Sequence, residues 1–513
     1  MTLLLLLSCS ENSLSGKGDN ASDDTGASFD SDADTDADSD ADADADTPPE
    51  EEDDFLKLAP AATDAYVFVA NPARDTVTRI AVPSLAVDTT TVGDNPTAVL
   101  TTADYLRAVT FNEASDDVTI IDAISFETTT VAVRDNFNTM SMSPDGKWIM
   151  AWYDQDIDSA SSSGGVQSFN EVSFVNLETA AHTPMAVGFN PHGVRWTPDG
   201  ARALVVSDAA LAVVNLTAGT LSPTLIELAD DPLAAPPAEE VELSNDGAYA
   251  FVRQFGTDEI LVVDLANLDV TAVSVGLNPT DLDLSPDGAD IAVVARGSRA
   301  LYVLSSANPF ETATVVPFPS DNAYGSVLYA GAGEKALLYT NADNIAKYGI
   351  WETGAGTILE RSLVKPVASM GVSPTGGSLL VFHTKGDVDD ADTSDPFYNE
   401  WALTLIDLDD YRQNPMLLPA EPTGYATSDD GTYGFFMMEG QPYLETLLLD
   451  QLLYEEIELK SLPAYVGVLP ETNIAYASQV HDLGRISFYD ADAQTLDTVT
   501  GFELNADIDH EDF

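Results

Sequence analysis

Hydrophobic and polar positions along this chain follow a repeated order of four short segments. In the clearest unit, residues 281–284 alternate polar and apolar side chains, and residues 291–295 are continuously apolar. Two further segments of the same kind follow at 300–304 and 314–318. Alternation is typical of a strand with one apolar face, and a short apolar run indicates a strand buried on both faces. The unit therefore predicts four short antiparallel strands.

A turn signature separates the first two segments of each unit. In the clearest unit it is Ser285-Pro286-Asp287-Gly288. Proline presets φ for the first central position of a type I turn, aspartate accepts hydrogen bonds from nearby amides, and glycine takes the left-handed conformation that closes a hairpin. Related copies occupy 143–146, 197–200, 244–247, 373–376 and 428–431, with degenerate ones at 330–333 and 469–473.

The spacing of these turns sets the repeat length. Gly247, Gly288 and Gly333 are 41 and 45 residues apart, so the basic period is about 42 residues. Four short antiparallel strands in each such period describe a blade of a β-propeller, which is an all-β fold. Repeats begin near Asn95, Asn136, Asn190, Pro236, Asn278, Asn322, Pro366, Pro422 and Pro463, after an incomplete first unit at 66–92.

The count is ten repeats, which is more than a propeller usually has. Either the ring is unusually large, or the degenerate unit 322–364 is not an ordinary blade. The first unit lacks its opening strand, and residues 505–509 parallel the opening segment of the unit at 278–283. We therefore expect a C-terminal strand to complete the first blade and close the ring.

Three segments carry a family resemblance. Residues 66–71, 75–80 and 91–97 resemble the YVTN repeat, which belongs to a β-propeller superfamily that also holds surface-layer proteins and lactonase-like enzymes. The resemblance covers nearly all of 65–513 and implies a propeller of WD40-like repeats. Its motif residues are structural, so it transfers no catalytic residue.

The N-terminus is typical of a targeting signal rather than of a folded segment. Leu6-Leu7-Ser8-Cys9 ends a run of leucines and resembles the lipobox of bacterial lipoproteins. The resemblance implies that residues 1–9 are a signal remnant and that Cys9 is lipidated. Ser10, which is not aspartate, favours the outer membrane of a Gram-negative cell envelope. The alternative is a chance cysteine in an unstructured N-terminus.

Residues 10–64 are rich in Ser, Asp, Ala and Gly, with an Asp-Xaa repeat at 32–46. Such a segment cannot bury enough apolar surface to fold, and charge repulsion extends it. We expect a disordered acidic tether that carries the propeller domain, residues 65–513. Beyond the N-terminus no apolar run is long enough for a transmembrane helix, so the lipid anchor is the expected membrane contact.

The charge of the chain excludes one class of partner. Its 86 Asp and Glu against 20 Lys and Arg give a formal net charge of −66. A surface this negative repels phosphate backbones, so nucleic acid is not an expected partner. The single cysteine excludes an intrachain disulfide and a cysteine-based zinc site.

Two acidic insertions fall between the second and third strands of their units. Alternating Asp oxygens on a tight loop suit calcium, the only cofactor the sequence suggests. The alternative is a solvated surface loop, because a chain this acidic contains such runs by chance. The candidate calcium ligands are Asp154, Asp156 and Asp158 in the first insertion, and Asp387, Asp389 and Asp392 in the second.

Other candidate residues lie near the expected inner strands. Arg195, Arg253 and Arg296 either line the channel and bind an anionic ligand or neutralise nearby carboxylates. The pairs Glu239–Glu240 and Asp281/Asp283 either do acid–base work or are chance neighbours. His383 is expected to be packed or exposed rather than catalytic.

The recurring residues are turn and packing residues, and no nucleophile–base–orienter set is visible. The expected function is therefore that of a cell-envelope lipoprotein with a non-catalytic propeller, which binds a protein or glycan partner at the cell surface. Two alternatives stay open. One is a lactonase-like hydrolase that uses channel residues, and the other is a calcium-stabilised surface-layer or adhesion component.

Overall fold

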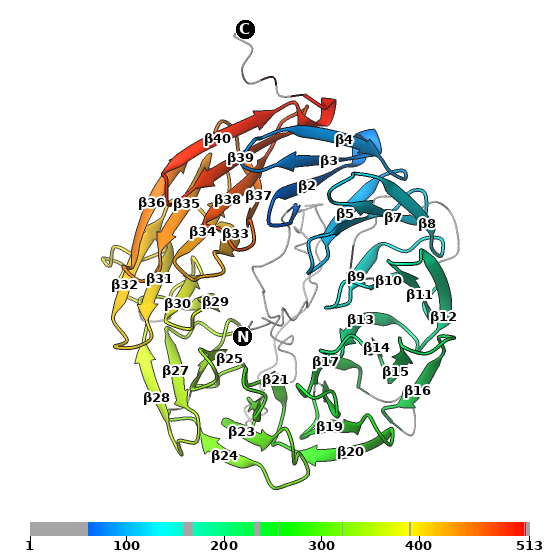
Figure 1. The fold of residues 1–513 in the computed structure, drawn as a ribbon. Coiled ribbons are helices and arrows are strands. Elements are labelled where there is room, and N and C mark those ends of the chain that lie inside the picture. The colour runs from blue at the N-terminus through cyan, green and yellow to red at the C-terminus, as the bar shows by residue number, and fades with distance from the viewer. Residues whose placement is uncertain are drawn as a thin grey trace, which may run out of the picture.

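A ring of ten four-stranded sheets makes up the fold (Figure 1). The computed structural model describes residues 60–155, 157, 168–229, 236–254, 256–320, 322–388, 391–506 and 508. The described residues contain forty strands and two short 3₁₀ helices, η1 (Pro72–Arg74) and η2 (Phe502–Leu504). Neither described helix is long and apolar enough to cross a membrane. The predicted all-β propeller of four-stranded antiparallel blades is confirmed, and the blades number ten.

The ten blades are numbered here in chain order. Blades 1 to 5 are β1 (Ala61–Ala62), β2 (Tyr66–Asn71), β3 (Thr76–Ala81), β4 (Val87–Thr91); β5 (Pro96–Thr101), β6 (Arg107–Asn112), β7 (Asp117–Asp122), β8 (Thr128–Ala132); β9 (Thr139–Met142), β10 (Trp148–Trp152), β11 (Glu171–Asn176), β12 (Ala181–Ala186); β13 (Pro191–Trp196), β14 (Arg202–Ser207), β15 (Ala210–Asn215), β16 (Pro223–Glu227); and β17 (Ala238–Leu243), β18 (Tyr249–Gln254), β19 (Glu259–Asp264), β20 (Asp269–Ser274).

Blades 6 to 10 are β21 (Pro279–Leu284), β22 (Asp290–Ala295), β23 (Ala300–Ser305), β24 (Thr314–Pro317); β25 (Ser326–Ala330), β26 (Lys335–Tyr339), β27 (Lys347–Glu352), β28 (Ile358–Ser362); β29 (Val367–Val372), β30 (Ser378–His383), β31 (Trp401–Asp407), β32 (Gln413–Leu418); β33 (Pro422–Thr427), β34 (Tyr433–Met438), β35 (Tyr443–Leu448), β36 (Leu453–Glu458); and β37 (Pro463–Val468), β38 (Ile474–Gln479), β39 (Arg485–Asp490), β40 (Thr495–Thr500).

The first strand of a blade lies nearest the ring centre and the fourth lies at the rim (Figure 1). The second strand is covered on both faces, which explains its continuous apolar sequence. In β22, Ile291 and Val293 pack toward blade 5, whereas Ala292 and Val294 pack toward blade 7. The core is thus a series of layers between neighbouring blades, and no single blade has a complete core of its own.

The turn signature forms the hydrogen bonds expected of it. Ser285 Oγ donates to Asp287 Oδ1 over 2.7 Å and accepts the Asp290 amide over 2.9 Å, while Asp287 Oδ1 accepts the Ala289 amide over 3.0 Å. Gly288 has a φ of +72°. The same side-chain pair recurs at Ser143, Thr197, Ser244 and Ser428, each with the aspartate two residues later.

A glycine of this turn also sets the spacing between blades. A Cβ on Gly376 would lie 2.2 Å from the Cα of Gly331 in blade 7, and Gly376 has a φ of +74°. We expect Gly376→Ala to lower the free energy of unfolding by more than about 2 kcal/mol, because alanine strains the backbone and also meets backbone atoms. Gly377→Ala is the matched control, since the nearest atom to its Cβ is 3.8 Å away. Urea denaturation checks both; equal losses would contradict the prediction.

The degenerate unit 322–364 is an ordinary blade. Its strands β25 to β28 form a four-stranded antiparallel sheet like the others, although its turn at 331–334 lacks the usual serine, proline and aspartate. The ten repeats therefore reflect an unusually large ring.

The predicted closure by a C-terminal strand is wrong. The opening strand of blade 1 is β1, which pairs Ala61 with Phe68 and Ala62 with Val67. Of the segment 505–509, residues 507 and 509 lie outside the described residues, and the remainder joins no sheet. The physical reason is position: the chain leaves blade 10 from its rim strand β40, whereas blade 1 needs its missing strand at the ring centre (Figure 1).

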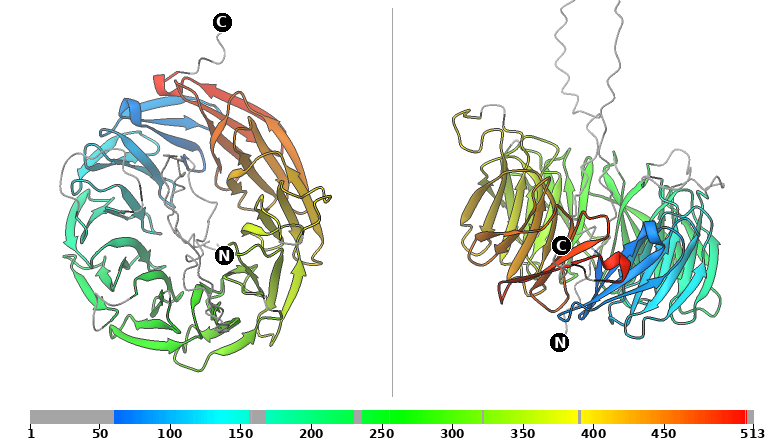
Figure 2. Two further views of the ribbon diagram at one scale, coloured as in Figure 1. Left: turned by 180° about the vertical axis from the view of Figure 1, so that it is seen from behind. Right: turned by 90° about the horizontal axis from the view of Figure 1, so that it is seen from above.

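The two ends of the ring instead pack side by side, as the red and blue segments of Figure 2 show. Val67 and Ile80 of blade 1 share an apolar cluster with Ile486 and Val499 of blade 10. The C-terminal helix η2 adds a second contact at the rim, where Thr78 Oγ1 of β3 donates to the Phe502 carbonyl over 3.2 Å. The ring is thus closed by packing rather than by a shared sheet.

Candidate functional site: the charged sector of the inner wall

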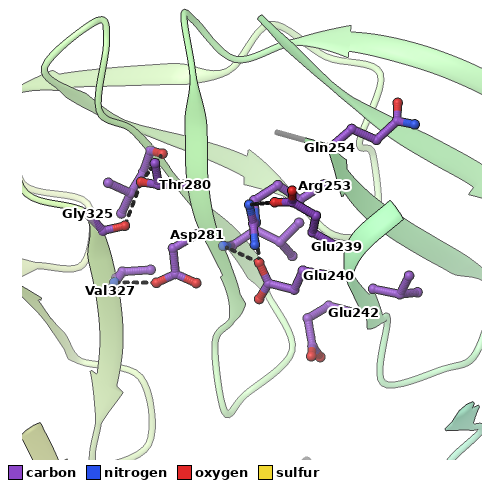
Figure 3. A network of polar contacts seen from close by, with 12 residues as sticks. Glu239, Glu240, Glu242, Arg253, Gln254, Thr280, Asp281, Gly325 and Val327 are labelled. Carbon is purple, nitrogen blue, oxygen red and sulfur yellow. Dashed lines mark hydrogen bonds and ion pairs between the residues drawn. The ribbon is translucent and has the colours of Figure 1, made fainter. Parts of the chain in front are cut away.

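Charge on the inner wall is confined to one sector. We use "inner wall" for the ten first strands of the blades. Within the described residues of those strands, Asp, Glu, Lys and Arg occur only on β13, β17 and β21, which belong to the neighbouring blades 4, 5 and 6. Together with Arg253 of β18, we call this group the charged sector: Arg195, Glu239, Glu240, Glu242, Arg253, Asp281 and Asp283 (Figure 3 shows five of them).

Arg253 lies at the centre of the sector with 9% of its side chain exposed. Its Nε contacts Glu240 Oε2 over 2.7 Å, and its Nη1 contacts Glu239 Oε2 over 2.9 Å (Figure 3). A β-bulge between Ala238 and Glu240 places two glutamates opposite this one arginine. The buried guanidinium is therefore paired with two carboxylates of its own blade.

Several side chains of the sector link one blade to the next. Glu240 Oε2 accepts the Leu282 amide over 3.1 Å, and Asp281 Oδ2 accepts the Val327 amide over 2.5 Å (Figure 3). Asp283 Oδ2 accepts the Tyr329 amide over 3.3 Å. These amides belong to the first strand of the following blade, whose inner edge has no neighbouring strand. The carboxylates thus satisfy backbone donors that would otherwise be unpaired.

Two carboxyls of the sector carry shifted pKa values. Burial raises the pKa of Glu242 to about 7, although Arg195 opposes the shift from 3.8 Å. Burial and the nearby charge of Glu242 raise the pKa of Asp283 well above its usual range. The side chain of Glu242 remains 21% exposed. Glu242 can therefore hold and release a proton near neutral pH, and Asp283 keeps its proton to a higher pH than an exposed aspartate does.

The three arginines singled out in the sequence all contact carboxylates. Besides the two partners of Arg253, Arg195 lies 3.8 Å from Glu242 and donates from Nε to the Val241 carbonyl over 2.6 Å. Arg296 lies 2.8 Å from Asp343. These contacts agree with neutralisation of nearby acids, the second of the two alternatives.

His383 is a packed histidine, as expected. It is fully buried, its Nδ1 lies 3.1 Å from the Pro366 carbonyl, and its Nε2 lies 2.7 Å from Thr404 Oγ1. Burial lowers its pKa to about 4. The last residue of the second strand makes the same link to the third strand in three other blades, as Asn71 to Thr78, Asn112 to Thr119 and Gln479 to Ser487. His383 therefore occupies a structural position of the repeat.

The first acidic insertion lies between β10 and β11, as predicted, but only Asp154 of its three candidate ligands is among the described residues. Asp154 is buried, and its main chain is held by Asn138, which accepts the Asp154 amide over 2.8 Å and donates to its carbonyl over 2.7 Å. Asp156 and Asp158 lie outside the described residues.

The second insertion lies between β30 and β31. Asp387 Oδ1 is 2.5 Å from Lys365 Nζ, and Asp392 Oδ1 accepts hydrogen bonds from the amide and hydroxyl of Ser394. Asp389 lies outside the described residues. In the described part of the chain, no three His, Cys, Asp or Glu side chains are placed to hold a metal ion. Calcium binding at either insertion stays a prediction.

A second acidic feature lies between the turns of blades 9 and 10. It is on the face of the ring opposite to the one that carries the two acidic insertions. It is a hollow of about 610 Å³ lined by nine residues, among them Asp429, Asp430, Glu471, Asp490 and Asp492. Part of this carboxylate surface is used internally, since Asp429 Oδ2 accepts the Glu471 amide over 2.7 Å. The lining would accept neutral or cationic groups and repel anions.

Sequence reasoning missed Glu242 and its proximity to Asp283. Each lies on the first strand of its own blade. The spacing of residues within one repeat does not predict which residues of neighbouring blades lie close together. The available signal was comparative: the first segments of the other units carry almost no charge. The inter-blade links of Glu240 and Asp281 were not foreseen for the same reason.

No family model matches the chain, and no curated protein matches it in sequence. Solved structures do resemble it. One titled as the eukaryotic initiation factor is 12% identical with a TM-score of 0.52, covering 77% of this chain and 96% of its own. Dihydro-heme d1 dehydrogenase NirN in complex with DHE is 13% identical with a TM-score of 0.44, covering 79% and 77%. The β-propeller domain of Cps50 (Swd1) from Myceliophteria thermophila is 14% identical with a TM-score of 0.34, covering 63% and 97%.

At these identities the likeness concerns the fold alone, and the ten four-stranded sheets of the chain itself define it as a β-propeller. A propeller can serve binding or catalysis, so the function has to be argued from the site.

Proposed function

We propose that this protein is a cell-envelope lipoprotein whose propeller is a non-catalytic scaffold for a protein or glycan partner at the cell surface. The observation that supports this proposal most is the internal use of the charged sector. Arg253 holds two glutamates, while Glu240, Asp281 and Asp283 accept backbone amides of the next blade. Groups engaged in this way stabilise the ring and are not available to bind a substrate.

The long insertions are the proposed docking elements. Each connects a second strand to a third strand, so the strand ends that flank the two insertions lie on the same face of the ring. The described part of the 384–400 loop stands above that face in the side view of Figure 2. Long loops on a rigid scaffold are where propellers commonly bind partners. With a net charge of −66, the fitting partner has a neutral or cationic surface.

The placement at the envelope rests on the sequence of the N-terminus, which lies outside the described residues. Leu6-Leu7-Ser8-Cys9 supplies the lipidation signal, and the acidic segment 10–64 supplies the tether. Two acyl chains are enough to hold a protein stably on a membrane.

We expect Cys9→Ala to move the full-length protein from the membrane fraction to the soluble fraction of the cell envelope. The reason is that this substitution removes the only thiol that can carry the lipid. Ser10→Ala is the control and should leave the protein in the membrane fraction. Immunoblots of fractionated cells measure both, and a membrane-bound Cys9→Ala protein would contradict the lipid anchor.

A second candidate function is a lactonase-like hydrolase, because burial raises the pKa of Glu242 to about 7 and raises the pKa of the nearby Asp283 above its usual range. Incubation of purified protein with a panel of lactones tests this alternative. Turnover that disappears in a folded Glu242→Gln variant would favour the hydrolase and contradict the non-catalytic scaffold. Absence of turnover in the native protein supports the scaffold.

The third candidate is a calcium-stabilised surface-layer or adhesion component. It depends on the two Asp-rich insertions. A rise of several degrees in melting temperature with millimolar calcium, lost in an Asp154→Ala, Asp156→Ala double variant, would support it.

A further inference from the structure

The second acidic insertion encloses a buried ammonium group. Lys365 lies two residues before the start of β29, and only 1% of its side chain is exposed. Its Nζ lies 2.5 Å from Asp387 Oδ1, 2.9 Å from the Phe397 carbonyl and 3.1 Å from the Lys385 carbonyl. An ammonium has three N–H donors, so all three have an acceptor. A buried cation persists in a protein only when it is paired and hydrogen-bonded in this way.

The three acceptors come from both arms of the loop. Lys385 and Asp387 lie on the arm that leaves β30, whereas Phe397 lies on the arm that returns to β31. The second oxygen of Asp387 reinforces the connection, since Oδ2 accepts the Asn399 amide over 2.7 Å. The side chain of Lys365, which reaches in from outside the loop, thus joins its two ends.

We infer that the ammonium of Lys365 is the resident cation of this loop and takes the place that a metal ion would have. A carboxylate oxygen and two carbonyl oxygens around one buried positive charge are the donor set that hard cations prefer. Here the charge belongs to the protein itself. The two described arms of the loop are therefore held together without added metal, and this connection does not depend on the calcium concentration around the cell.

Removal of the ammonium leaves Asp387 and two carbonyls facing a buried space of the same size. Their negative potential remains, because the acceptors are unchanged. That space should accept a small external cation, and n-propylammonium matches the atoms that Lys365→Ala deletes beyond Cβ. These contacts of Lys365 do not depend on the proposed function. If the loop is a docking element, Lys365 holds that element in shape.

Limited proteolysis of the full-length protein tests the inference, with chymotrypsin cleavage at Phe397 or Tyr398 as the readout. We expect native protein to be cut at the same slow rate in EDTA and in 5 mM calcium. Lys365→Ala should be cut about tenfold faster or more, because cleavage follows the population of the opened loop. Addition of n-propylammonium should restore most of the protection. Lys385→Ala is the matched control, since its exposed side chain makes none of these contacts.

Two results would overturn the inference. One is faster cleavage of the native loop in EDTA, which would mean that a metal holds it. The other is a Lys365→Ala rate equal to that of Lys385→Ala. If Lys365→Ala fails to fold, hydrogen exchange on the native protein decides: the Asn399 amide should be protected equally with and without EDTA.

Discussion

Replacement of Arg253 by methionine should lower the free energy of unfolding by about 3–5 kcal/mol at pH 8. Removing one partner of a buried ion pair leaves the other charge uncompensated. Here two carboxylates, Glu239 and Glu240, lose their partner at once, and Glu240 also accepts the Leu282 amide of the next blade. The loss should be smaller at pH 5. Burial already raises the pKa of Glu239, so this carboxyl can take up a proton when the arginine is absent.

Urea denaturation at the two pH values measures the effect. Arg412→Met is the matched control, because Arg412 is 60% exposed and lies 3.3 Å from its single carboxylate partner Asp407. An exposed pair of this kind contributes about 1 kcal/mol or less. If the two variants lost the same stability at pH 8, the structural role assigned to the charged sector would be wrong.

Replacement of Glu445 by methionine should have the opposite effect and stabilise the protein by about 1–3 kcal/mol at pH 8, the usual cost of burying an unpaired polar group. Glu445 lies on β35 opposite Phe436, whose ring belongs to the apolar cluster between blades 8 and 9. The side chain is fully buried, and neither carboxyl oxygen has a hydrogen-bond partner among the residues that the structure describes. Methionine has a similar volume and no polar atom to bury.

The pH dependence of this effect has a defined sign. Burial, with a smaller contribution from the charge of Glu456, raises the pKa of Glu445 to about 8. Between about pH 4.5 and 8 the folded state therefore keeps a proton that the unfolded chain has lost. Stability contributed by the neutral acid is complete below this window and is lost as the pH rises through it. The methionine variant should lack this decline.

Thermal or urea unfolding from pH 4 to 9 provides the comparison. Glu458→Met on the neighbouring rim strand is a suitable control, since that side chain is exposed and its replacement should change stability by less than about 0.5 kcal/mol. A Glu445→Met protein that is less stable than the native protein at pH 8 would show that the carboxyl has a partner in solution.

The parts of the fold that depend on local chemistry could be predicted from the sequence. The Ser285 turn forms within six residues, and the apolar run of β22 reports burial on both faces without reference to a particular partner. These local signals were enough to count ten repeats, although they did not show that the unit 322–364 is an ordinary blade. The way in which the ring closes could not be predicted from local sequence. It depends on how the strands of blade 1 lie against those of blade 10 in the folded ring. The two-residue strand β1 is also too short to leave a hydrophobic pattern.

The candidate site could be predicted only in part. Arg195 and Arg253 stood out because arginine is scarce, and their carboxylate partners are on the same or the next blade. Pairing between blades is set by the geometry of the ring, so the sequence could not show that Asp281 reaches the Val327 amide. Lys365 illustrates the same limit. It lies 22 residues before Asp387, and only the folded loop brings the two together.

The protein is a closed ring of ten blades whose first and last members pack directly against each other. Electron cryomicroscopy of the purified protein, with class averages viewed along the ring axis, tests it most directly. We expect ten evenly spaced blades and continuous density between blades 1 and 10. An average with a different number of blades, or an open gap at that junction, would contradict it.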